Sequence, residues 1–492
     1  MEQHARLVAE LTGRWPENRV APSLTRISAL CGLLGDPQHA TPVIHLTGTN
    51  GKGSTGAIID ALLRSVGLRT GRFSSPHLSD LTERISIDGQ PIGKQDFADL
   101  WEQVAPMVQM VDEQRLDGVP MTFFEVMTGL AFAAFADAPV DVAIVEVGLG
   151  GRWDATNVAD AQVAVLTPIS LDHTHLLGDD VVAIAEEKAG IIKEGACAVL
   201  AGQEPEVAKA LLRRCAEVGA KVITEGVDFA VLDRTLAVGG QVIRIDAHDG
   251  PVGELHLPLH GAHQAHNAAL AVAAVEAFLG ETGLDPQVIQ DGLDEVRSPG
   301  RLELVRRSPS IVLDAAHNPH GARAAAEALT EAFSPDPLVL VFAVMRDKDA
   351  DEMLRVWDEV ATEVVITRVA GTDRAMPVDD LAEQAEGIFG ATRVHRAERL
   401  DDAIELATAR AEALAGSGGQ PGVLVTGSVI AVGQARTLLV GDEPTPAEPV
   451  ELEVGAPHDP DAAFDEALRR AFEEQLSDDH VNGHGFGEGM DR

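Results

Sequence analysis

The sequence predicts an α/β fold with two domains, each built on a mainly parallel sheet covered by helices on both faces. Apolar β-type segments alternate with Ala-rich helical patterns along most of the chain, which is typical of parallel sheets. Pro299 and Gly300 interrupt this alternation, and it then starts afresh. The chain has 492 residues, which exceeds the roughly 150 residues of an average domain. Apolar residues make up 45% and charged residues 24% of it, as in globular proteins.

The first predicted element pair is a strand followed by a helix within residues 42–67. An apolar run ends in the Gly-rich segment 48–54, and a helical pattern of apolar residues follows it. Further buried strands are predicted at 142–147, 163–167, 198–201, 311–313, 338–344, 363–369 and 422–426. Ala-rich helices are predicted between most of them, for example at 183–193, 266–279 and 321–333.

The composition divides the chain into three parts. Residues 1–297 are predicted to form the first domain and residues 298–441 the second. Residues 442–492 carry 15 acidic residues against 3 Arg, a net charge of −12, and are rich in Pro. Such a segment buries too little apolar surface to fold, so a disordered acidic tail is expected there.

The charge of the whole chain favours small molecules as partners. Lys plus Arg (38) minus Asp plus Glu (78) gives −40, whereas proteins that bind nucleic acid or a membrane surface need a basic face. Three scattered cysteines form neither a disulfide framework nor a zinc site, which fits a reducing compartment. The first residues lack a signal-peptide core and no apolar run is long enough to span a membrane. A cytoplasmic protein is expected.

The segment 48–54 has the features of a phosphate-binding loop. It follows a strand and opens a helix, so its backbone N–H groups and the helix N-terminus would point at phosphate oxygens while Lys52 neutralises charge. It departs from the Walker A spacing, because Leu46 stands five residues before Gly51 and Gly53 follows Lys52. The alternative is a Gly-rich turn that carries an exposed lysine.

Polar residues at other strand ends are candidates for a metal site. Glu146 ends an apolar run, so its carboxylate would project at the carboxyl edge of the sheet; a buried Glu146 paired with Arg152 is the alternative. Asp172, His173 and His175 follow another strand and would suit a divalent cation.

Lys188 lies on a predicted amphipathic helix. Its spacing alone favours a surface lysine that pairs with Glu186 or Glu187.

The predicted second domain has its own polar turn. Asp314 ends a strand, His317 and Asn318 follow it, and Pro319 leads into a helix. Arg301 could bind an anion as an always-charged fork, with a surface arginine as the alternative. Together with the loop at 48–54, these residues indicate a nucleotide-dependent enzyme.

Several ordered blocks between residues 24 and 440 resemble the folylpolyglutamate synthase and dihydrofolate synthase family, within the Mur-type ATP-dependent ligases. The blocks are HLTGTNGKGS, SSPHL, TFFEVMTGLAF, VEVGLGGRWDATNV, ISLDHTHLLGD, EEKAGIIK, HNAALA, SPGRLE, DAAHNPHG and MRDKD. The resemblance implies a P-loop-containing, Mur-ligase-like N-terminal domain and a smaller, Rossmann-like C-terminal α/β domain. It also implies an ATP-dependent ligase that adds L-glutamate to dihydropteroate, to reduced folates, or to both.

The resemblance implies roles for residues that match the family's motifs. Those implied to bind ATP are Thr49, Asn50, Gly51, Lys52, Gly53, Ser54, Asn267, Arg301 and Asp314. Those implied to hold Mg²⁺ are Ser75, Glu146 and His173. The resemblance reverses the spacing argument for Lys188, which matches a catalytic lysine that becomes carbamylated. His317 is a second candidate catalytic residue, next to the ATP-binding positions. Those implied to bind the pterin substrate are Arg26, Thr122, Phe123, Phe124, Glu125, Trp153, Asp154 and Ala155.

The implied reaction is chemically reasonable. A carboxylate is a poor acyl donor, so ATP first converts it to an acyl phosphate, and the amino group of glutamate then displaces phosphate. Phosphoryl transfer depends mainly on positioning and charge neutralisation, which a phosphate loop, Mg²⁺ and cationic side chains supply. Closure of two domains would keep water from the acyl phosphate. A monomer is expected.

Two other functions stay open from the sequence. A Mur-type ligase acting on a nucleotide-sugar would use the same chemistry, but those enzymes generally carry a further N-terminal domain and a Thr directly after the loop lysine. Only 47 residues precede Gly48, and Gly53 stands in the Thr position. A nucleotide-binding ATPase without ligase activity would turn over ATP independently of glutamate and of any pterin.

Overall fold

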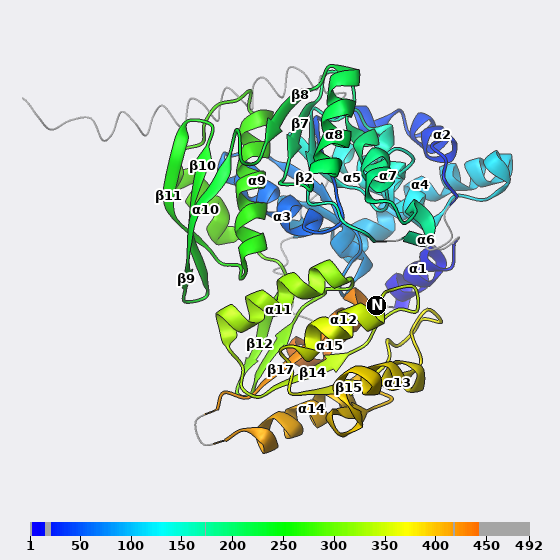
Figure 1. Cartoon of the computed structure of the whole chain (residues 1–492). Helices are drawn as coiled ribbons and strands as arrows, with labels where there is room; N and C mark the ends of the chain where they lie inside the picture. The colour runs from blue at the N-terminus through cyan, green and yellow to red at the C-terminus, as the bar shows by residue number, and fades with distance from the viewer. Residues whose placement is uncertain (1, 15–20, 173, 417–418, 442–492) are drawn as a thin grey trace, which may run out of the picture.

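Two separate sheets form the frame of the chain, one in each of two lobes (Figure 1). The computed structural model describes residues 2–14, 21–172, 174–416 and 419–441. His173, a predicted metal ligand, and the predicted acidic tail at 442–492 lie outside the described residues.

The larger lobe contains an eight-stranded sheet in the order β4-β3-β2-β5-β1-β6-β7-β8. Its strands are β1 (Val43–Thr47), β2 (Thr70–Phe73), β3 (Ile85–Ile87), β4 (Gln90–Pro91), β5 (Val142–Glu146), β6 (Val163–Leu166), β7 (Cys197–Leu200) and β8 (Lys221–Thr224). In this order, every pair of neighbouring strands from β2 onward to β8 is parallel. At the other edge, β3 pairs antiparallel with β2, and β4 pairs antiparallel with β3. The strands predicted at 142–147, 163–167 and 198–201 are confirmed to within one residue.

Helices cover both faces of this sheet. They are α1 (Glu2–Thr12), α2 (Thr25–Leu33), α3 (Lys52–Ser65), α4 (Lys94–Gln114), α5 (Phe123–Asp137), α6 (Thr174–Leu177), α7 (Val181–Lys188), α8 (Pro205–Val218), α9 (Ala262–Phe278) and α10 (Pro286–Glu295). Alternate side chains of a strand enter opposite cores. Ile44 and Leu46 of β1 pack with α3, α9 and α10, whereas Val43 packs with α2, α4 and α5. Because the side chains on both faces of the sheet are buried, most of its strands are rich in apolar residues and do not alternate between apolar and polar ones.

A three-stranded antiparallel sheet, which the sequence analysis did not anticipate, packs against α9 and α10. It consists of β9 (Ala230–Ala237), β10 (Gly240–Ala247) and β11 (Gly250–Leu257). Gly239 and Gly250 have φ angles of 80° and 107°, a conformation that favours glycine in tight hairpin turns. Ile243, Ile245 and Leu257 bury one face of the sheet against the α9 side of the core.

The smaller lobe contains a six-stranded sheet in the order β12-β13-β17-β14-β15-β16. Its strands are β12 (Glu303–Arg307), β13 (Ser310–Leu313), β14 (Leu338–Phe342), β15 (Glu363–Ile366), β16 (Val394–Arg396) and β17 (Gly422–Thr426). Its helices are α11 (Pro319–Phe333), α12 (Ala350–Asp358), α13 (Val378–Phe389), α14 (Leu400–Leu414) and α15 (Val429–Val440). Helices α11 to α13 cover one face, and α14 and α15 the other. The predicted α/β fold with two mainly parallel, helix-covered sheets is confirmed, and the antiparallel sheet β9 to β11 is an addition to it.

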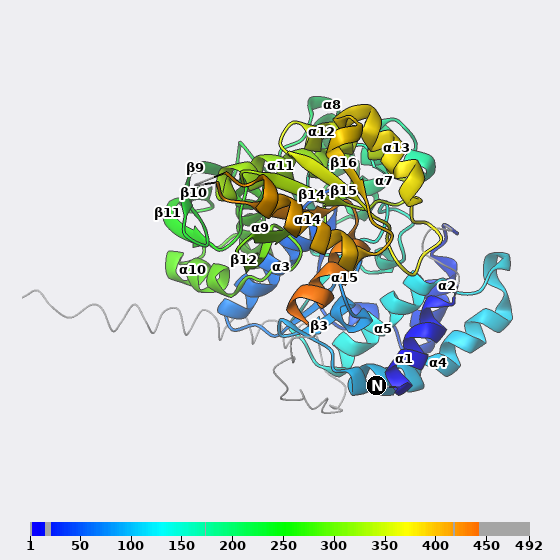
Figure 2. The same ribbon diagram turned by 90° about the horizontal axis from the view of Figure 1, so that it is seen from below.

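The two lobes face each other across the carboxyl ends of their parallel strands. In the view of Figure 2 the smaller lobe lies in front of the larger one, and α11 packs near α9. The segment between α10 and β12 connects the lobes; the domain boundary at 297/298 falls within it and stays a prediction. Within the described part of the chain, none of the helices has the length and apolar character to cross a bilayer.

Candidate active site

Two cavities meet between the lobes. The loop cavity, of about 500 Å³, is lined by residues 48–54 together with residues of α9 and α11. The aromatic cavity, of about 770 Å³, is lined by Phe123, Phe124 and Trp153 among others. Six residues line both cavities: Ser75, Pro76, Gly148, Leu149, His317 and Val429. A molecule in one cavity can therefore touch a molecule in the other.

The predicted phosphate loop joins β1 to α3, as expected. The helix begins at Lys52, and Gly51 before it has a φ angle of 92°. This backbone conformation favours glycine, and a Cβ at position 51 would also lie 2.7 Å from Oδ1 of Asn267. Lys52 donates through Nζ to the carbonyl oxygen of Gly48 at 3.1 Å. The loop therefore presents helix N–H groups and a cation to the cavity, as an anion-binding site requires.

Glu146 stands at the end of β5 and lines the loop cavity. It is 7% exposed, and its Oε2 accepts a hydrogen bond from the backbone N–H of Ser75 at 3.3 Å. Burial raises the pKa of Glu146, and the nearby Lys52 opposes this rise. The alternative pairing with Arg152 is wrong, because Arg152 instead donates to the carbonyl oxygen of Glu186.

Lys188 is buried at the end of α7 and lines the same cavity. Its side chain is 5% exposed, and Nζ donates to the carbonyl oxygen of Gly48 at 3.0 Å. Burial, followed by the charge of Lys52, lowers the pKa of Lys188 to about 7. The surface pairing that its spacing favoured is wrong. The segment at Gly151 packs so closely on this helix end that a Cβ there would lie 2.7 Å from the carbonyl oxygen of Lys188.

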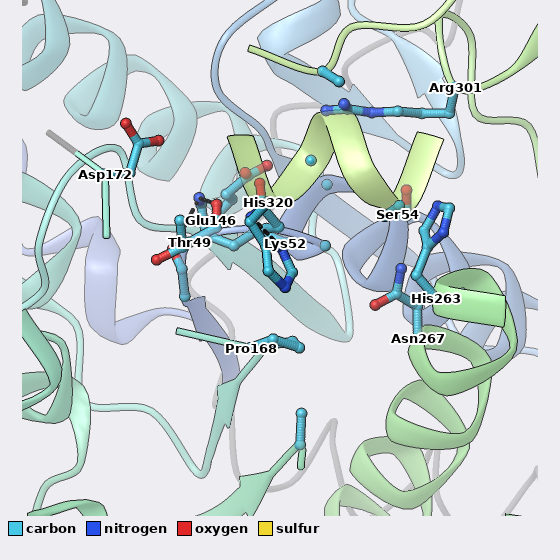
Figure 3. Close-up of a pocket in the computed structure, with 18 of the residues that line it drawn as sticks. Thr49, Lys52, Ser54, Glu146, Pro168, Asp172, His263, Asn267, Arg301 and His320 are labelled. Atoms are coloured by element: carbon cyan, nitrogen blue, oxygen red, sulfur yellow. Dashed lines mark hydrogen bonds between the residues drawn. The ribbon is translucent and has the colours of Figure 1, made fainter. Parts of the chain in front are cut away.

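Asp172 connects the lobes instead of standing free to bind a cation. Its carboxylate accepts hydrogen bonds from Lys348 at 2.6 Å and from Asn318 at 3.2 Å, both in the smaller lobe. Figure 3 shows Asp172 at one end of the loop cavity, with His263 and Asn267 of α9 at the other. No group of three His, Cys, Asp or Glu among the described residues has a metal-binding arrangement.

The smaller lobe adds a buried carboxylate and an imidazole. Asp314 accepts backbone N–H groups from Leu302 at 3.0 Å and Ala316 at 2.9 Å. Burial raises its pKa, and the charge of Arg301 opposes this rise.

The ring of His317 is held in one orientation. Nδ1 lies 3.0 Å from the carbonyl oxygen of Ala315, a bond that requires Nδ1 to carry the proton. Burial, and then the charge of Lys348, lowers the pKa of His317 to about 4. The ring is therefore neutral. His317 lines both cavities, and its unprotonated Nε2 lies 3.8 Å from Oδ2 of Asp172.

The structure brings together the predicted ATP-binding residues. All nine line the loop cavity: Thr49, Asn50, Gly51, Lys52, Gly53, Ser54, Asn267, Arg301 and Asp314. Ser75 and Glu146, two of the three predicted metal ligands, line it too.

Seven of the eight predicted pterin-binding residues line the aromatic cavity: Thr122, Phe123, Phe124, Glu125, Trp153, Asp154 and Ala155. Arg26 does not line it. Its guanidinium is 1% exposed and binds Glu125, with Nε 3.1 Å from Oε2. Each buried charge is paired with the other, and Arg26 lies behind Glu125, which lines the cavity while Arg26 does not.

The sequence analysis missed several residues that line the cavities. His263 and Gln264 stand one turn before Asn267 on α9, and this helical spacing could have identified them. Arg84 and Lys348 line the aromatic cavity. Lys348 lies in the quoted block MRDKD, whereas no pattern around Arg84 marks it as a site residue.

Comparisons with known proteins identify the class of protein that this fold and site define. The family model "Mur ligase middle domain" matches residues 46–275, and "Mur ligase, glutamate ligase domain" matches residues 300–429. These ranges cover most of both cavity-forming sheets, so the chain is a Mur-type ligase.

Relatives narrow this class to one family. The dihydrofolate synthase/folylpolyglutamate synthase of Mycobacterium tuberculosis is 48% identical over 453 residues, covering 88% of this chain and 93% of the relative. The structure of Mycobacterium tuberculosis folylpolyglutamate synthase complexed with ADP aligns with a TM-score of 0.86 at 47% identity, over 90% of this chain and 99% of that one. An Escherichia coli structure titled "FolC in complex with DHPP and ADP" aligns at 0.75 and 29%, over 89% and 97%.

The chain belongs to the folylpolyglutamate synthase and dihydrofolate synthase family. The family resemblance and the ATP-dependent ligase class predicted from the sequence are thereby confirmed.

Proposed function

We propose that this chain uses ATP to add L-glutamate both to dihydropteroate and to reduced folates that already carry glutamate. The observation that carries this proposal is the junction of two chemically different cavities at Ser75, Leu149 and His317. The loop cavity suits a nucleotide triphosphate, and the aromatic cavity suits a flat ring. The carboxylate to be activated would lie between them.

In the first step, an oxygen of the substrate carboxylate attacks the γ-phosphorus of ATP, the bond to the β-phosphate oxygen breaks, and ADP leaves. Lys52 and the N–H groups that open α3 would hold the phosphates and neutralise the charge that develops on them. Arg301, which lines the same cavity, is a further cation for the nucleotide, and Asn267 faces the loop at Gly51.

In the second step, the amino nitrogen of glutamate attacks the acyl carbon, the tetrahedral intermediate collapses, and phosphate leaves while the nitrogen loses its proton. His317 would accept a hydrogen bond from this nitrogen through Nε2 and so orient its lone pair. The contacts of Asp172 with Lys348 and Asn318 keep the lobes together around the junction, which would keep water away from the acyl phosphate.

The described residues fit a magnesium ion. Glu146 is an ionisable carboxylate whose Oε2 accepts a long hydrogen bond from the backbone N–H of Ser75, and Ser75 adds a hydroxyl oxygen. Mg²⁺ is commonly held by one or two protein oxygens together with phosphates and water. When bound, Mg²⁺ would neutralise phosphate charge. His173 is the third proposed ligand.

The surroundings of Lys188 support carbamylation. The neutral amine adds to the carbon of CO₂ and releases a proton, which leaves an anionic carbamate on Nζ. A pKa of about 7 supplies the neutral amine, and the cation of Lys52 lies close enough to favour the anion. The carbamate would help to set the metal and the phosphates.

Ligation assays with ATP and glutamate test the proposal, run in parallel with dihydropteroate, with a reduced folate, and with neither. We expect phosphate release and a product heavier by one glutamate only when a pterin substrate is present. ATP turnover that ignores both glutamate and pterin would indicate an ATPase, and glutamate transfer to a nucleotide-sugar would indicate the other Mur-type function. We also propose that the protein is cytoplasmic and monomeric. One chain supplies both sides of the junction, which supports the monomer, and light scattering of the purified protein tests its mass.

A further inference from the structure

A buried histidine lies behind the aromatic cavity, outside the wall of either cavity. His45 is on β1, three residues before Gly48, and its side chain is fully buried. Nε2 lies 2.8 Å from Oγ1 of Thr156. Nδ1 has no hydrogen-bond partner among the described residues. An unpaired buried nitrogen costs free energy, so packing alone does not explain why a histidine occupies this position.

Thr156 connects His45 to a residue of the cavity wall. Its Oγ1 lies 2.5 Å from Oδ1 of Asp154, and its backbone N–H donates to the same oxygen at 3.0 Å. The other carboxylate oxygen, Oδ2, accepts the backbone N–H of Leu149 at 2.9 Å. Asp154 lines the aromatic cavity and Leu149 lines both cavities. A continuous hydrogen-bonded chain therefore runs from β1 to the cavity wall.

The chemistry of the three groups determines which one donates and which one accepts in each of these hydrogen bonds. Thr156 has one hydroxyl proton, and the carboxylate of Asp154 can only accept when it is ionised. The hydroxyl therefore donates to Asp154 and accepts from His45, so the proton of the neutral ring must be on Nε2. The environment keeps the ring neutral: burial, and then the charge of Lys193, lowers the pKa of His45 to about 3.

We propose that His45 is a positioning residue for the pterin substrate: acting through Thr156, it fixes the Asp154 carboxylate as a hydrogen-bond acceptor toward a ring that carries N–H donors. This inference rests on the proposed function, because it assumes that the aromatic cavity holds a pterin. Burial alone would favour the protonated carboxyl, and it raises the pKa of Asp154 to about 6, a rise that the hydrogen bonds of Thr156 and Leu149 oppose. The donor from His45 adds to this opposition by polarising the Thr156 hydroxyl.

The position of His45 on β1 lets an effect on the pterin site be separated from a general structural effect. His45 precedes the phosphate loop by three residues, so a purely structural role would affect both cavities when the residue is changed. The hydrogen-bonded chain leads only to Asp154. The proposal therefore predicts a change in the KM for the pterin substrate and no change in the KM for ATP.

Three variants and one double variant of the full chain test this. His45→Leu removes the donor and the unpaired Nδ1, so its melting temperature should not fall. Its KM for dihydropteroate should rise about tenfold, the effect of about 1.4 kcal/mol, while its KM for ATP stays the same. Thr156→Val keeps the side-chain shape, removes the connecting hydroxyl and should have a similar effect. His45→Gln retains an N–H donor in that direction and should recover most of the affinity.

The double variant His45→Leu with Thr156→Val decides whether the two residues act on Asp154 through the same series of hydrogen bonds. If they do, its KM for dihydropteroate equals that of the worse single variant; independent effects would multiply. Multiplied effects, an equal rise in both KM values, or an unchanged KM in His45→Leu would each overturn the proposal. An inactive wild-type protein with every pterin tested would instead contradict the proposed function.

Discussion

Nδ2 of Asn318 donates to Oδ1 of Asn50 at 3.0 Å, so an amide from the smaller lobe binds the side chain of a phosphate-loop residue in the larger lobe. Nδ1 of His320 lies 3.0 Å from Nδ2 of the same Asn50. Asn50 is thus bound by the smaller lobe through both ends of its amide. The phosphate loop and the closure of the lobes are connected at this residue.

The first prediction concerns Asn318→Asp. Its side-chain oxygen can still accept the N–H of Gly321, at 2.7 Å in the wild type, and so cap α11. It loses the donor to Asn50 and brings a second carboxylate against Asp172. We expect the lobes to separate, with kcat falling about tenfold, the effect of about 1.4 kcal/mol, and the radius of gyration in solution rising. Asn318→Ser keeps a cap without the added charge and should be affected less; equal kcat in wild type and Asn318→Asp would contradict this role.

The second prediction concerns Lys52→Ala. Lys52 bonds only to loop carbonyl oxygens among the contacts described, so the circular-dichroism spectrum should not change. Loss of the cation at the phosphates should lower kcat by about 10²–10³, as for other preorganised transition-state contacts. Lys209→Ala, on the exposed side of α8, is the matched control. Near wild-type turnover of Lys52→Ala at saturating ATP would place the phosphates elsewhere.

The third prediction concerns Glu146→Gln. The amide keeps the size of the side chain but loses the anion that the proposed Mg²⁺ would need. We expect the Mg²⁺ concentration for half-maximal activity to rise about tenfold or more, the effect of at least 1.4 kcal/mol. A magnesium titration of activity measures it, with the exposed Glu102→Gln on α4 as the control. Identical titrations for Glu146→Gln and wild type would exclude Glu146 as a ligand.

The fourth prediction follows from the pKa of Lys188, which burial lowers from 10.5 to about 7. Between these values the unfolded chain holds a proton that the folded chain lacks, so the contribution of Lys188 to the free energy of unfolding rises with pH, by about 1.4 kcal/mol per unit at most. Below pH 7 both states are protonated and the contribution is constant at its least favourable value. Denaturant unfolding in CO₂-free buffer, compared with Lys188→Met, should show this difference.

Carbamylation of Lys188 has its own tests. Lys188→Ala should be nearly inactive, and acetate or formate should partly restore its activity by occupying the vacated anionic position. Bicarbonate should stabilise the wild type but not Lys188→Met. A plain lysine side chain in the density of a metal-bound crystal soaked with bicarbonate would contradict the assignment.

The sequence predicted the phosphate loop and the buried strands because local patterns determine them. The apolar runs at β5, β6 and β17 are buried on both faces, and a glycine is required at Gly51 by its backbone conformation. The antiparallel sheet β9 to β11 was missed because its strands mix charged and apolar residues. The turn pair Asp249-Gly250 and the glycines at 239 and 240 are hairpin signals that could have indicated it.

Contacts between distant segments were beyond local patterns. The spacing of Lys188 beside Glu186 and Glu187 predicts a surface lysine. Packing of the distant segment at Gly151 on the end of α7 accompanies its burial instead. Arg26 was placed in the substrate pocket by family resemblance, whereas a buried ion pair with Glu125 holds it behind the wall. Such outcomes depend on which segments pack together, which the spacing of residues along one helix does not contain.

The six residues shared by the two cavities have a thermodynamic consequence. A ligand that shifts Leu149 or His317 changes the wall of the neighbouring site as well, so the two binding equilibria are linked. Linkage is reciprocal: whatever factor the pterin substrate adds to the affinity for nucleotide, the nucleotide must add to the affinity for the pterin substrate. Affinity measured for either ligand alone will therefore differ from its affinity in the ternary complex by one common factor.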